Sequence, residues 1–530
     1  MSPSTPVPRC PSCQSAVYKC MSAQVIKELL LSIISGVLLV LSFPNFNLEF
    51  LAWFAFVPLF FTLKNKSKGK VFLLSYITGV VFWLGTIYWL IHVTLLGMLL
   101  LVLYLALYFG FFGLVLSTTS YELRATSLFS IPSIWVFLEY LRSHLLTGFG
   151  WALLGYSQYL NLPIIQIADI TGTWGVSFLV MMVNVLLYGL ICHRLQLTGH
   201  RLKILMLALT CSLWLSVYGY GLFKLRPTTG GLRPKIIRVS VIQGNISQEM
   251  KWQPSTKDFI FKKYLAISHM AAKEKPDLII WPEAALPVIL EEEPFYYGMV
   301  SDFVRESRIP LLLGAVTLRD NLYYNSAILV SPEGRLANRY DKLHLVPFGE
   351  YVPLKKILPF LETIVPIGDI AAGKEYTVFG AYLTSGPGHS FQSKFSVLIC
   401  FEDLFPELSR EFVKRGAHFL VNITNDGWYK KTAAAYQHFQ ASVFRAVENR
   451  VFLVRSANTG ISGFINPRGE IISLVRDQSG REIFVDGYKT QEIGIPKRQR
   501  SFYSRYGDVF VVLCVFIVLY GIITAIKKRD

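Results

Sequence analysis

The chain has 530 residues, too many for one ordinary domain, and 52% of them are hydrophobic while only 16% are charged. Soluble domains carry roughly a quarter charged residues, so this composition and a mean hydropathy of +0.43 exclude an ordinary soluble protein and predict an integral membrane protein. The net charge of +17 does not indicate nucleic-acid binding, because the basic residues are spread out and no recognition helix or RNA-binding aromatic motif is present.

The first part of the chain predicts a polytopic bundle of transmembrane helices. Residues 1–24 are polar, hold three of the seven cysteines and are expected to form a disordered extension. Stretches apolar and long enough to span a membrane run over 25–43, 49–63, 71–91, 94–117, 128–147, 164–192, 203–223 and 509–526. We therefore expect about eight spans, seven within 25–224 and one within 506–530. Asp169 and the Glu139/Arg142 pair are expected at span ends, in contact with water.

The charges of the loops predict the orientation of these spans. With eight spans, the basic clusters at 64–70, 193–203 and 527–529 all fall on the side of the N-terminus, which should then be cytoplasmic. The segment 225–505 is consequently expected across the membrane, on the periplasmic face of a bacterial inner membrane.

Segment 225–505 has a different pattern from the rest of the chain. Short β-branched or aromatic runs lie at 236–243, 277–281, 310–316, 325–330, 395–399, 418–423, 451–455 and 463–466, and helical patterns at 254–274, 296–306, 406–415 and 432–449. This alternation predicts a layered α/β domain. Residues 354–387 add apolar sequence, which we interpret either as an interfacial lid or as an ordinary packed insertion.

Three residues of this domain follow strands and have types that suit nucleophilic catalysis. Glu283 follows the strand at 277–281, Lys342 lies in the loop after residue 340, and Cys400, the domain's single cysteine, follows the strand at 395–399. A cysteine needs a base to become a thiolate, and an ammonium can stabilise both that thiolate and an oxyanion. Taken singly, each residue is more often structural, as a core cysteine or a solvated loop charge.

The motifs around these residues resemble the Glu–Lys–Cys signature of the nitrilase (carbon–nitrogen hydrolase) superfamily. They read Trp281-Pro282-Glu283, Asp341-Lys342-Leu343-His344, Pro347-Phe348-Gly349-Glu350 and Cys400-Phe401-Glu402, in that order. With spans before and after this domain, the chain from about 25 to 527 resembles the apolipoprotein N-acyltransferase family. The resemblance implies a nitrilase-like αββα sandwich as the catalytic domain.

The resemblance also implies roles for individual residues. Glu283 would be the general base, Lys342 the oxyanion stabiliser and Cys400 the nucleophile that carries an acyl thioester. It further implies that Glu350 is a supporting catalytic carboxylate. Trp252, Phe401 and Glu402 would bind the substrate. The family often has tyrosine where this chain has Phe401, so any role of that hydroxyl is absent here.

The implied reaction moves a fatty acyl chain from a membrane phospholipid, through the thioester, to the N-terminal amine of diacylglyceryl-cysteine in an apolipoprotein. The alternative enzyme is a membrane-bound carbon–nitrogen hydrolase (amidase) that releases the acyl group to water. A catalytically dead lipid-binding scaffold has no need of all three residues, and a transporter lacks paired half-helix signals. Cys10 and Cys13 form half of a zinc motif without a partner pair, so we expect no metal. We also expect no cofactor and a monomeric enzyme.

Overall fold

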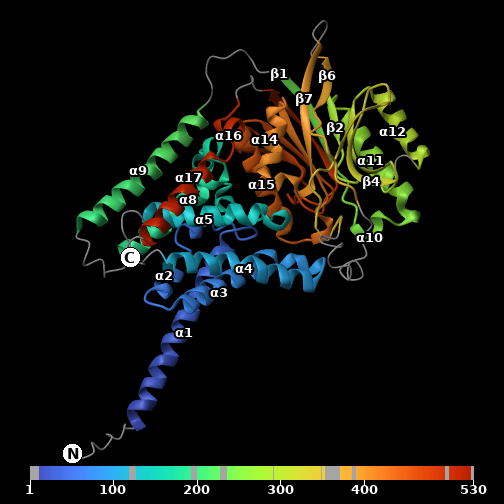
Figure 1. The fold of residues 1–530 in the computed structure, drawn as a ribbon. Helices are drawn as coiled ribbons and strands as arrows, with labels where there is room; N and C mark the ends of the chain where they lie inside the picture. The colour runs from blue at the N-terminus through green and yellow to red at the C-terminus, as the bar shows by residue number, and fades with distance from the viewer. Residues whose placement is uncertain are drawn as a thin grey trace, which may run out of the picture.

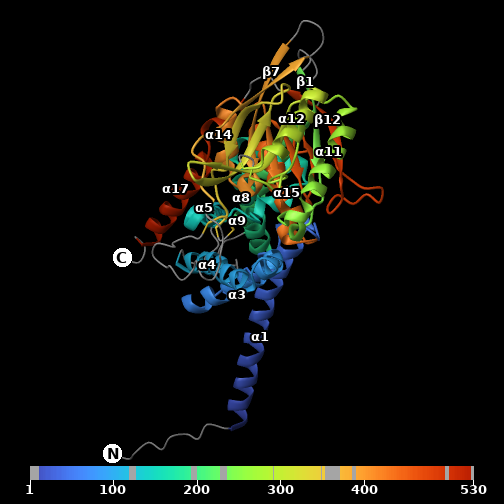
Figure 2. The ribbon, with the colours of Figure 1, turned by 90° about the vertical axis from the view of Figure 1, so that its right-hand side faces the viewer.

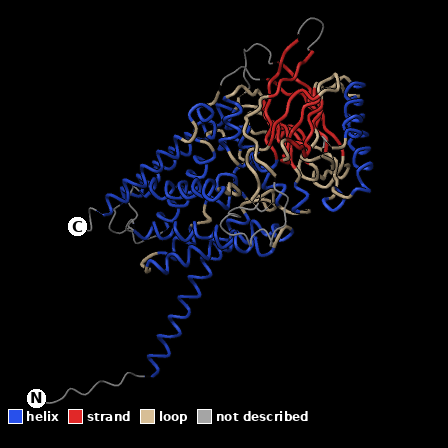
Figure 3. Tube along the Cα trace, turned by 45° about the vertical axis from the view of Figure 1, so that its right-hand side comes forward, coloured by secondary structure: helices blue, strands red, loops and turns tan. Residues whose placement is uncertain are grey.

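The computed structural model describes residues 11–118, 127–191, 200–226, 235–289, 292–347, 349–351, 370–384, 390–495 and 500–526. A helical region and an α/β sandwich lie against each other, and the last helix returns from the sandwich to the helical region (Figure 1). The strands gather in one part of the molecule and the long helices in the other (Figure 3). Most of the apolar segment 354–387, interpreted above as a lid or an insertion, lies outside the described residues.

The helical region follows from long apolar runs in the sequence. Its helices are α1 (Pro11–Leu41), α2 (Val57–Leu63), α3 (Lys68–Ile87), α4 (Leu95–Thr118), α5 (Ser127–His144), α6 (Leu162–Ile165), α7 (Ala168–Thr171), α8 (Thr173–Ile191), α9 (His200–Leu225) and α17 (Val509–Ile526), with 3-10 turns η1 (Glu49–Trp53), η2 (Tyr88–His92), η3 (Leu145–Thr147) and η4 (Leu154–Gln158). Helix α1 begins inside the segment expected to be an extension. Its N-terminal half projects away from the other helices (Figures 1 and 2).

Within the described residues, five helices are long and apolar enough to cross a membrane, where the sequence predicted about eight spans. They are Ala23–Leu41, Lys68–His92, Leu95–Ser117, Thr173–Ile191 and Lys203–Leu225. The segments predicted at 49–63 and 509–526 form shorter apolar helices, and α5, which carries Glu139 and Arg142, is not among the five. The segment 164–192 is interrupted, because α7 ends at Gly172 with a φ of 65° and only α8 is continuous.

The expectation that Asp169 and the Glu139/Arg142 pair contact water is wrong. All three side chains are at least 96% buried. Glu139 Oε1 accepts a 2.7 Å hydrogen bond from the Leu154 amide, Arg142 donates to two backbone carbonyls of the following loop, and Asp169 pairs with Arg450 of the sandwich. Partners from the protein take the place of water, because an unpaired buried charge is strongly unfavourable.

The sandwich consists of two six-stranded sheets between two layers of helices. One sheet has the order β12-β1-β2-β3-β4-β5, and the other β11-β10-β9-β8-β7-β6. The strands are β1 (Lys235–Gln243), β2 (Leu278–Ile280), β3 (Leu311–Arg319), β4 (Leu322–Val330), β5 (Leu336–Asp341), β6 (Phe379–Thr384), β7 (Ser390–Ile399), β8 (Phe419–Thr424), β9 (Phe452–Ala457), β10 (Gly463–Ile465), β11 (Ile471–Leu474) and β12 (Gly487–Ile495). The predicted αββα architecture is confirmed.

The helices of the sandwich cover the outer faces of the two sheets. Helices α11 (Lys257–Ala272) and α12 (Pro294–Ser307) pack on the first sheet, and α14 (Pro406–Lys414) and α15 (Ala434–Asn449) on the second (Figure 1). Between the sheets, Ser456 Oγ donates to the carbonyls of Ile242 and Ile280 at 2.9 and 3.2 Å. These bonds hold the carboxyl ends of central strands from both sheets close together.

Helix α15 fastens the sandwich to the helical region. Glu448 Oε1 accepts from the amide of Thr173 at 3.0 Å and from its hydroxyl at 2.8 Å, at the start of α8. Gln437 Oε1 accepts from the indole nitrogens of Trp89 and Trp151 at 3.0 and 2.8 Å. Every one of these five residues is fully or almost fully buried. The two regions therefore share one continuous interior.

Candidate active site

Cys400 lies on a strained turn between β7 and the 3-10 turn η7 (Cys400–Leu404). Its φ of 55° falls in the left-handed region, which non-glycine residues rarely adopt and which is enriched at functional turns. Asn422 of the neighbouring β8 donates to the Cys400 carbonyl at 2.9 Å, and this hydrogen bond stabilises the turn. The cysteine is only 8% exposed. This is the strand-to-helix turn on which an α/β enzyme presents a nucleophile.

Glu283 lies on the turn that follows β2, where Trp281-Pro282 ends the strand. The next residue, Ala284, has a φ of 43°, and the turn is bonded to β3 through the Gly314 amide, which donates to the Pro282 carbonyl at 3.2 Å. A Cβ on Gly314 would lie 2.7 Å from the Cα of Glu283, so glycine is required at this close approach.

Lys342 lies between two carboxylates at the end of β5. Its Nζ is 3.5 Å from Glu283 Oε1 and 3.0 Å from Glu350 Oε1, and its side chain is 1% exposed. Asn325 of β4 bridges the same two carboxylates, because its Nδ2 donates to Glu283 Oε1 and Glu350 Oε1 at 2.8 Å each. The structure thus brings together Glu283, Lys342 and Glu350, three of the residues singled out in the sequence.

The electrostatic environment keeps the thiol protonated at rest and the lysine charged. Burial raises the pKa of the Cys400 thiol well above its usual value; the Glu283 carboxylate raises it further, and Lys342 opposes this. Burial alone would lower the pKa of Lys342, but the carboxylates of Glu350 and Glu283 outweigh it and raise that pKa. Glu283, Lys342 and Cys400 are therefore close enough to influence one another's charge. A buried thiol of this kind needs a base to take its proton before it can act as a nucleophile.

Glu402 joins the cysteine turn to the lysine loop. Its carboxylate accepts from the amides of Ile399, Leu343 and His344 at 2.7, 2.8 and 3.0 Å, and from the Tyr340 hydroxyl at 2.9 Å. Burial raises the pKa of Glu402 to about 7, although these amides favour its charged form. All of these partners are protein groups, so the geometry gives Glu402 a positioning role, and substrate contact stays a prediction.

The two aromatic residues expected to contact substrate lie in different settings. Phe401 is half-buried, and its ring lies 5.2 Å from the Lys342 ammonium and 5.4 Å from the Phe405 ring. Trp252 follows the short helix α10 (Gln248–Lys251) and is 48% exposed. Helix α10 is tied to the loop after β8 by a 2.9 Å bond from Asn425 Nδ2 to Gln248 Oε1. Trp252 thus stays available to a ligand at the surface beside the site.

A buried network of charged side chains is bonded to Asp403, which lies on the same turn as Cys400. His438 of α15 bonds to Asp403 through Nε2 and to Asp426 through Nδ1, at 2.9 and 2.8 Å. Arg455 Nη1 lies 3.0 Å from Asp403 and donates to Asn422 at 2.6 Å. Burial and Arg455 lower the pKa of His438, but the two carboxylates outweigh them and raise it. A charged imidazole and a guanidinium thus neutralise two buried aspartates beneath Cys400.

Sequence reasoning missed four residues of this site, which are Lys251, Asn325, Tyr340 and Asn422. Asn325 and Asn422 lie in predicted strands, where a single polar residue in an apolar run is the only available signal, and Tyr340 lies in β5, a strand that was not predicted. Their partners come from distant segments, so spacing along the chain could not identify them. Lys251 stood next to Trp252 without its burial being apparent.

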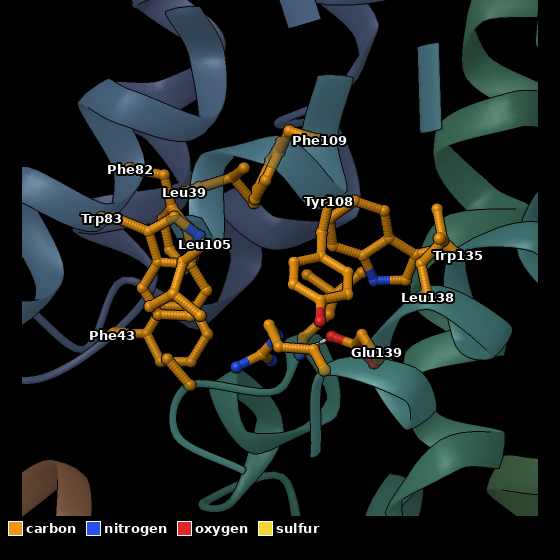
Figure 4. Close-up of a pocket in the computed structure, with 13 residues that line it drawn as sticks. Leu39, Phe43, Phe82, Trp83, Leu105, Tyr108, Phe109, Trp135, Leu138 and Glu139 are labelled. Carbon is orange, nitrogen blue, oxygen red and sulfur yellow. Dashed lines mark hydrogen bonds between the residues drawn. The ribbon is translucent and has the colours of Figure 1, made fainter. Parts of the chain in front are cut away.

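A cavity lies within the helical region, and none of the predicted site residues lines it (Figure 4). It measures about 20 Å³ and lies among the aromatic rings of Phe43, Trp83 and Trp135, with Glu139 and Arg142 at its edge. A cavity of this size holds about one water molecule. Neither of the two sheets contributes to its lining.

Comparison with known proteins covers both regions of the chain. Residues 35–186 match the family model "Apolipoprotein N-acyltransferase N-terminal domain", and residues 238–486 match "Carbon-nitrogen hydrolase". Among solved structures, an amidase from Nesterenkonia sp. is 16% identical and covers 54% of this chain and 100% of its own, with a TM-score of 0.38. A nitrilase-superfamily member from Saccharomyces cerevisiae is 18% identical and covers 50% and 93%, with a TM-score of 0.36.

Two curated relatives match over nearly their whole length. The apolipoprotein N-acyltransferase of Geobacter metallireducens is 40% identical over 92% of this chain and 93% of its own. That of Chlorobaculum tepidum is 30% identical over 96% and 98%. The chain is a membrane protein with several candidate spans, and both relatives are bacterial. At this identity and coverage, the chain belongs to the apolipoprotein N-acyltransferase family.

Proposed function

We propose that this chain transfers a fatty acyl group from a membrane phospholipid to the N-terminal amine of diacylglyceryl-cysteine in apolipoproteins, with Cys400 as the nucleophile. The observation that carries the proposal is the convergence of Glu283, Lys342 and Cys400 from three strand ends, in a chain of which 92% matches an apolipoprotein N-acyltransferase. One chain supplies all three groups, so the reaction needs no residue from a second copy, which is compatible with the monomer expected from the sequence.

In the first half-reaction the Cys400 sulfur attacks the ester carbonyl of the phospholipid. Glu283 takes the thiol proton, the C–S bond forms, and the negative charge on the carbonyl oxygen is stabilised by the ammonium of Lys342. When the intermediate collapses, the ester C–O bond breaks, and the lysophospholipid oxygen takes the proton back from Glu283. Glu350 keeps Lys342 charged and in place throughout, at 3.0 Å.

In the second half-reaction the neutral α-amine of the acceptor attacks the thioester carbonyl. A C–N bond forms, Glu283 accepts a proton from the nitrogen, and the oxyanion again faces Lys342. The C–S bond then breaks, and the sulfur recovers a proton from Glu283. The same carboxylate thus serves as base and acid in both halves.

The helical region gives the site access to lipid substrates. Moving an acyl chain of about 15 methylenes into water costs on the order of 12 kcal/mol, at about 0.8 kcal/mol for each one. A site held at the membrane surface avoids most of this cost, since the chain can stay in the bilayer while its carbonyl reaches Cys400. The half-exposed Trp252 lies beside the site, where we assign it to the substrate entrance.

We assign the catalytic domain, residues 225–505, to the periplasmic face of the inner membrane. Lys66 and Lys70, in the basic cluster between predicted spans two and three, pair with Glu28 of α1. The other end of that helix is next to the sandwich, because the Pro44 carbonyl accepts from Gln437. Glu28 and the end of α1 are about 20 Å apart at 1.5 Å per residue. Basic residues favour the cytoplasmic side, so this separation supports a catalytic domain on the opposite side.

Mass spectrometry of the Cys400 peptide after incubation with phospholipid alone tests the proposal. The parent protein should gain one acyl group on Cys400 and pass it on when a diacylated lipopeptide is added. Cys400→Ala should bind the membrane normally but transfer nothing, and Glu283→Gln and Lys342→Ala should accumulate no thioester. Rapid release of free fatty acid to water, with none on the peptide, would instead indicate the amidase alternative. Full transfer by Cys400→Ala would refute the mechanism.

A further inference from the structure

Lys251 is a buried lysine beside the reacting groups, and the reaction as written above does not use it. It is the last residue of α10 and is 2% exposed, whereas the adjacent Trp252 is 48% exposed. Lysine is among the side chains least often buried, and it is buried only with compensation from its surroundings. Its burial at this position therefore calls for a specific reason.

The contacts of Lys251 point to the Glu283 turn. Its Nζ donates to the backbone carbonyl of Glu283 at 3.1 Å, whereas Lys342 lies 3.5 Å from the carboxylate of the same residue. In the described part of the chain, no carboxylate lies within 4.0 Å of this ammonium. The titratable groups that face it are Glu283, after β2, and Cys400, at the start of η7. Burial lowers the pKa of Lys251 to about 8, and these two groups oppose the decrease.

The balance of charge at the site explains what a second ammonium does. Lys342 faces two carboxylates, Glu283 and Glu350, at 3.5 and 3.0 Å. Without another cation the resting site would carry one excess negative charge, and a thiolate would form in that field. An ammonium at Lys251 makes the four charges cancel. Because the site is buried, the effect of one charge on the thiolate is larger than in water.

We propose that Lys251 is a positioning residue of the acyl-transfer site, which holds the Glu283 turn through its carbonyl oxygen and offsets the negative charge that develops on Cys400. The role in acyl transfer rests on the proposed function, but the effect of Lys251 on Cys400 can be tested independently of it. Thiol reactivity can be measured without any lipid. Failure of acyl transfer and failure of this inference are therefore separable outcomes.

The test is the pH dependence of Cys400 alkylation by iodoacetamide in the full chain, followed on the Cys400 peptide by mass spectrometry. Lys251→Met should slow alkylation by about tenfold near pH 7, where the parent carries the Lys251 ammonium. Lys251→Arg should keep the parent rate near pH 7, because arginine also carries a positive charge there. The control is Lys257→Met on α11, which removes a partly exposed lysine paired with Glu293 and should leave the profile unchanged.

A comparison that does not depend on the methionine variant uses the parent and Lys251→Arg. In the parent, alkylation and thioester formation should lose the support of the ammonium above about pH 8, whereas Lys251→Arg should keep it to higher pH. Identical profiles for parent, Lys251→Met and Lys251→Arg would overturn the inference. The inference would also be overturned if the alkylation rates of the parent and Lys251→Arg depended on pH in the same way above about pH 8. A shifted alkylation profile in a chain that transfers no acyl group would support the inference and reject the proposed function.

Discussion

Gly314 of β3 lies against the Glu283 turn, and its replacement by alanine tests how the sandwich holds this carboxylate. An added Cβ would lie 2.6 Å from the Pro282 carbonyl oxygen and 2.7 Å from both the Ala284 amide nitrogen and the Glu283 Cα, where ordinary contacts begin at 3.4 Å. All three atoms belong to the backbone, so no side chain can move aside. The turn that carries Glu283 must therefore retreat from β3 by nearly an ångström.

Two effects of Gly314→Ala follow from this displacement. Overpacking of a buried strand lowers the free energy of unfolding by about 1–3 kcal/mol. A shift of about 1 Å in a catalytic group can lower the rate about 100-fold. We expect slower thioester formation on Cys400 from phospholipid, measured by peptide mass spectrometry in a single-turnover experiment, at temperatures where the variant is folded.

Gly298→Ala is the matched control for this experiment. Gly298 lies inside α12, where an added Cβ would meet nothing within 4 Å. Alanine is favoured over glycine in a helix by about 0.5–1 kcal/mol, so this variant should be slightly more stable and fully active. A Gly314→Ala protein that forms the thioester at the parent rate would show that the Glu283 turn tolerates displacement, and the positional argument would be wrong.

Three further variants test other parts of the structure. Glu402→Gln places an amide N–H against backbone donors and should lower the free energy of unfolding by about 2–4 kcal/mol, as chemical denaturation would measure. Because the pKa of His438 is raised in the folded state, its stabilisation should be complete below about pH 6.5 and decline as pH rises through the folded value; His438→Gln should lose this pH dependence in melting experiments. Arg450→Met leaves Asp169 with fewer partners and should cost about 2–3 kcal/mol, whereas an unchanged melting temperature would contradict the role of this ion pair.

The sequence predicts the inner strands well and the outer strands poorly. All eight predicted strands are present, and they are the four inner strands of each sheet. The four that were not predicted, β5, β6, β11 and β12, are the four edge strands. Inner strands are buried on both faces, so their sequences are continuous apolar runs. Edge strands such as β5 and β12 contain polar residues among the apolar ones, so their sequences resemble those of loops. The Glu–Lys–Cys residues were recognisable because each follows an inner strand or lies in a distinctive motif.

The membrane spans show the opposite error, since apolar sequence was interpreted too uniformly. The segment 164–192 reads as one long run, but Gly172 breaks it and Asp169 is held by Arg450 of the sandwich. Glu139 and Arg142 are buried by contacts that no hydropathy average contains. Hydropathy describes the average environment of a segment, and it contains no information about an ion-pair partner that lies 281 residues away in the sequence.

The positions of these partners show why the catalytic domain and the membrane helices form one functional unit. Helix α15 carries Gln437, which binds tryptophans of the helical region, and directly after it His438, which binds the aspartates beneath the cysteine turn. Asp403 on that turn is separated from Cys400 by only two residues. A displacement of α15 relative to the membrane would therefore move Asp403 and the nucleophile with it. In the mechanism proposed above, the acyl chain stays in the bilayer while its carbonyl meets Cys400, so we expect this link to set the depth at which the enzyme reacts.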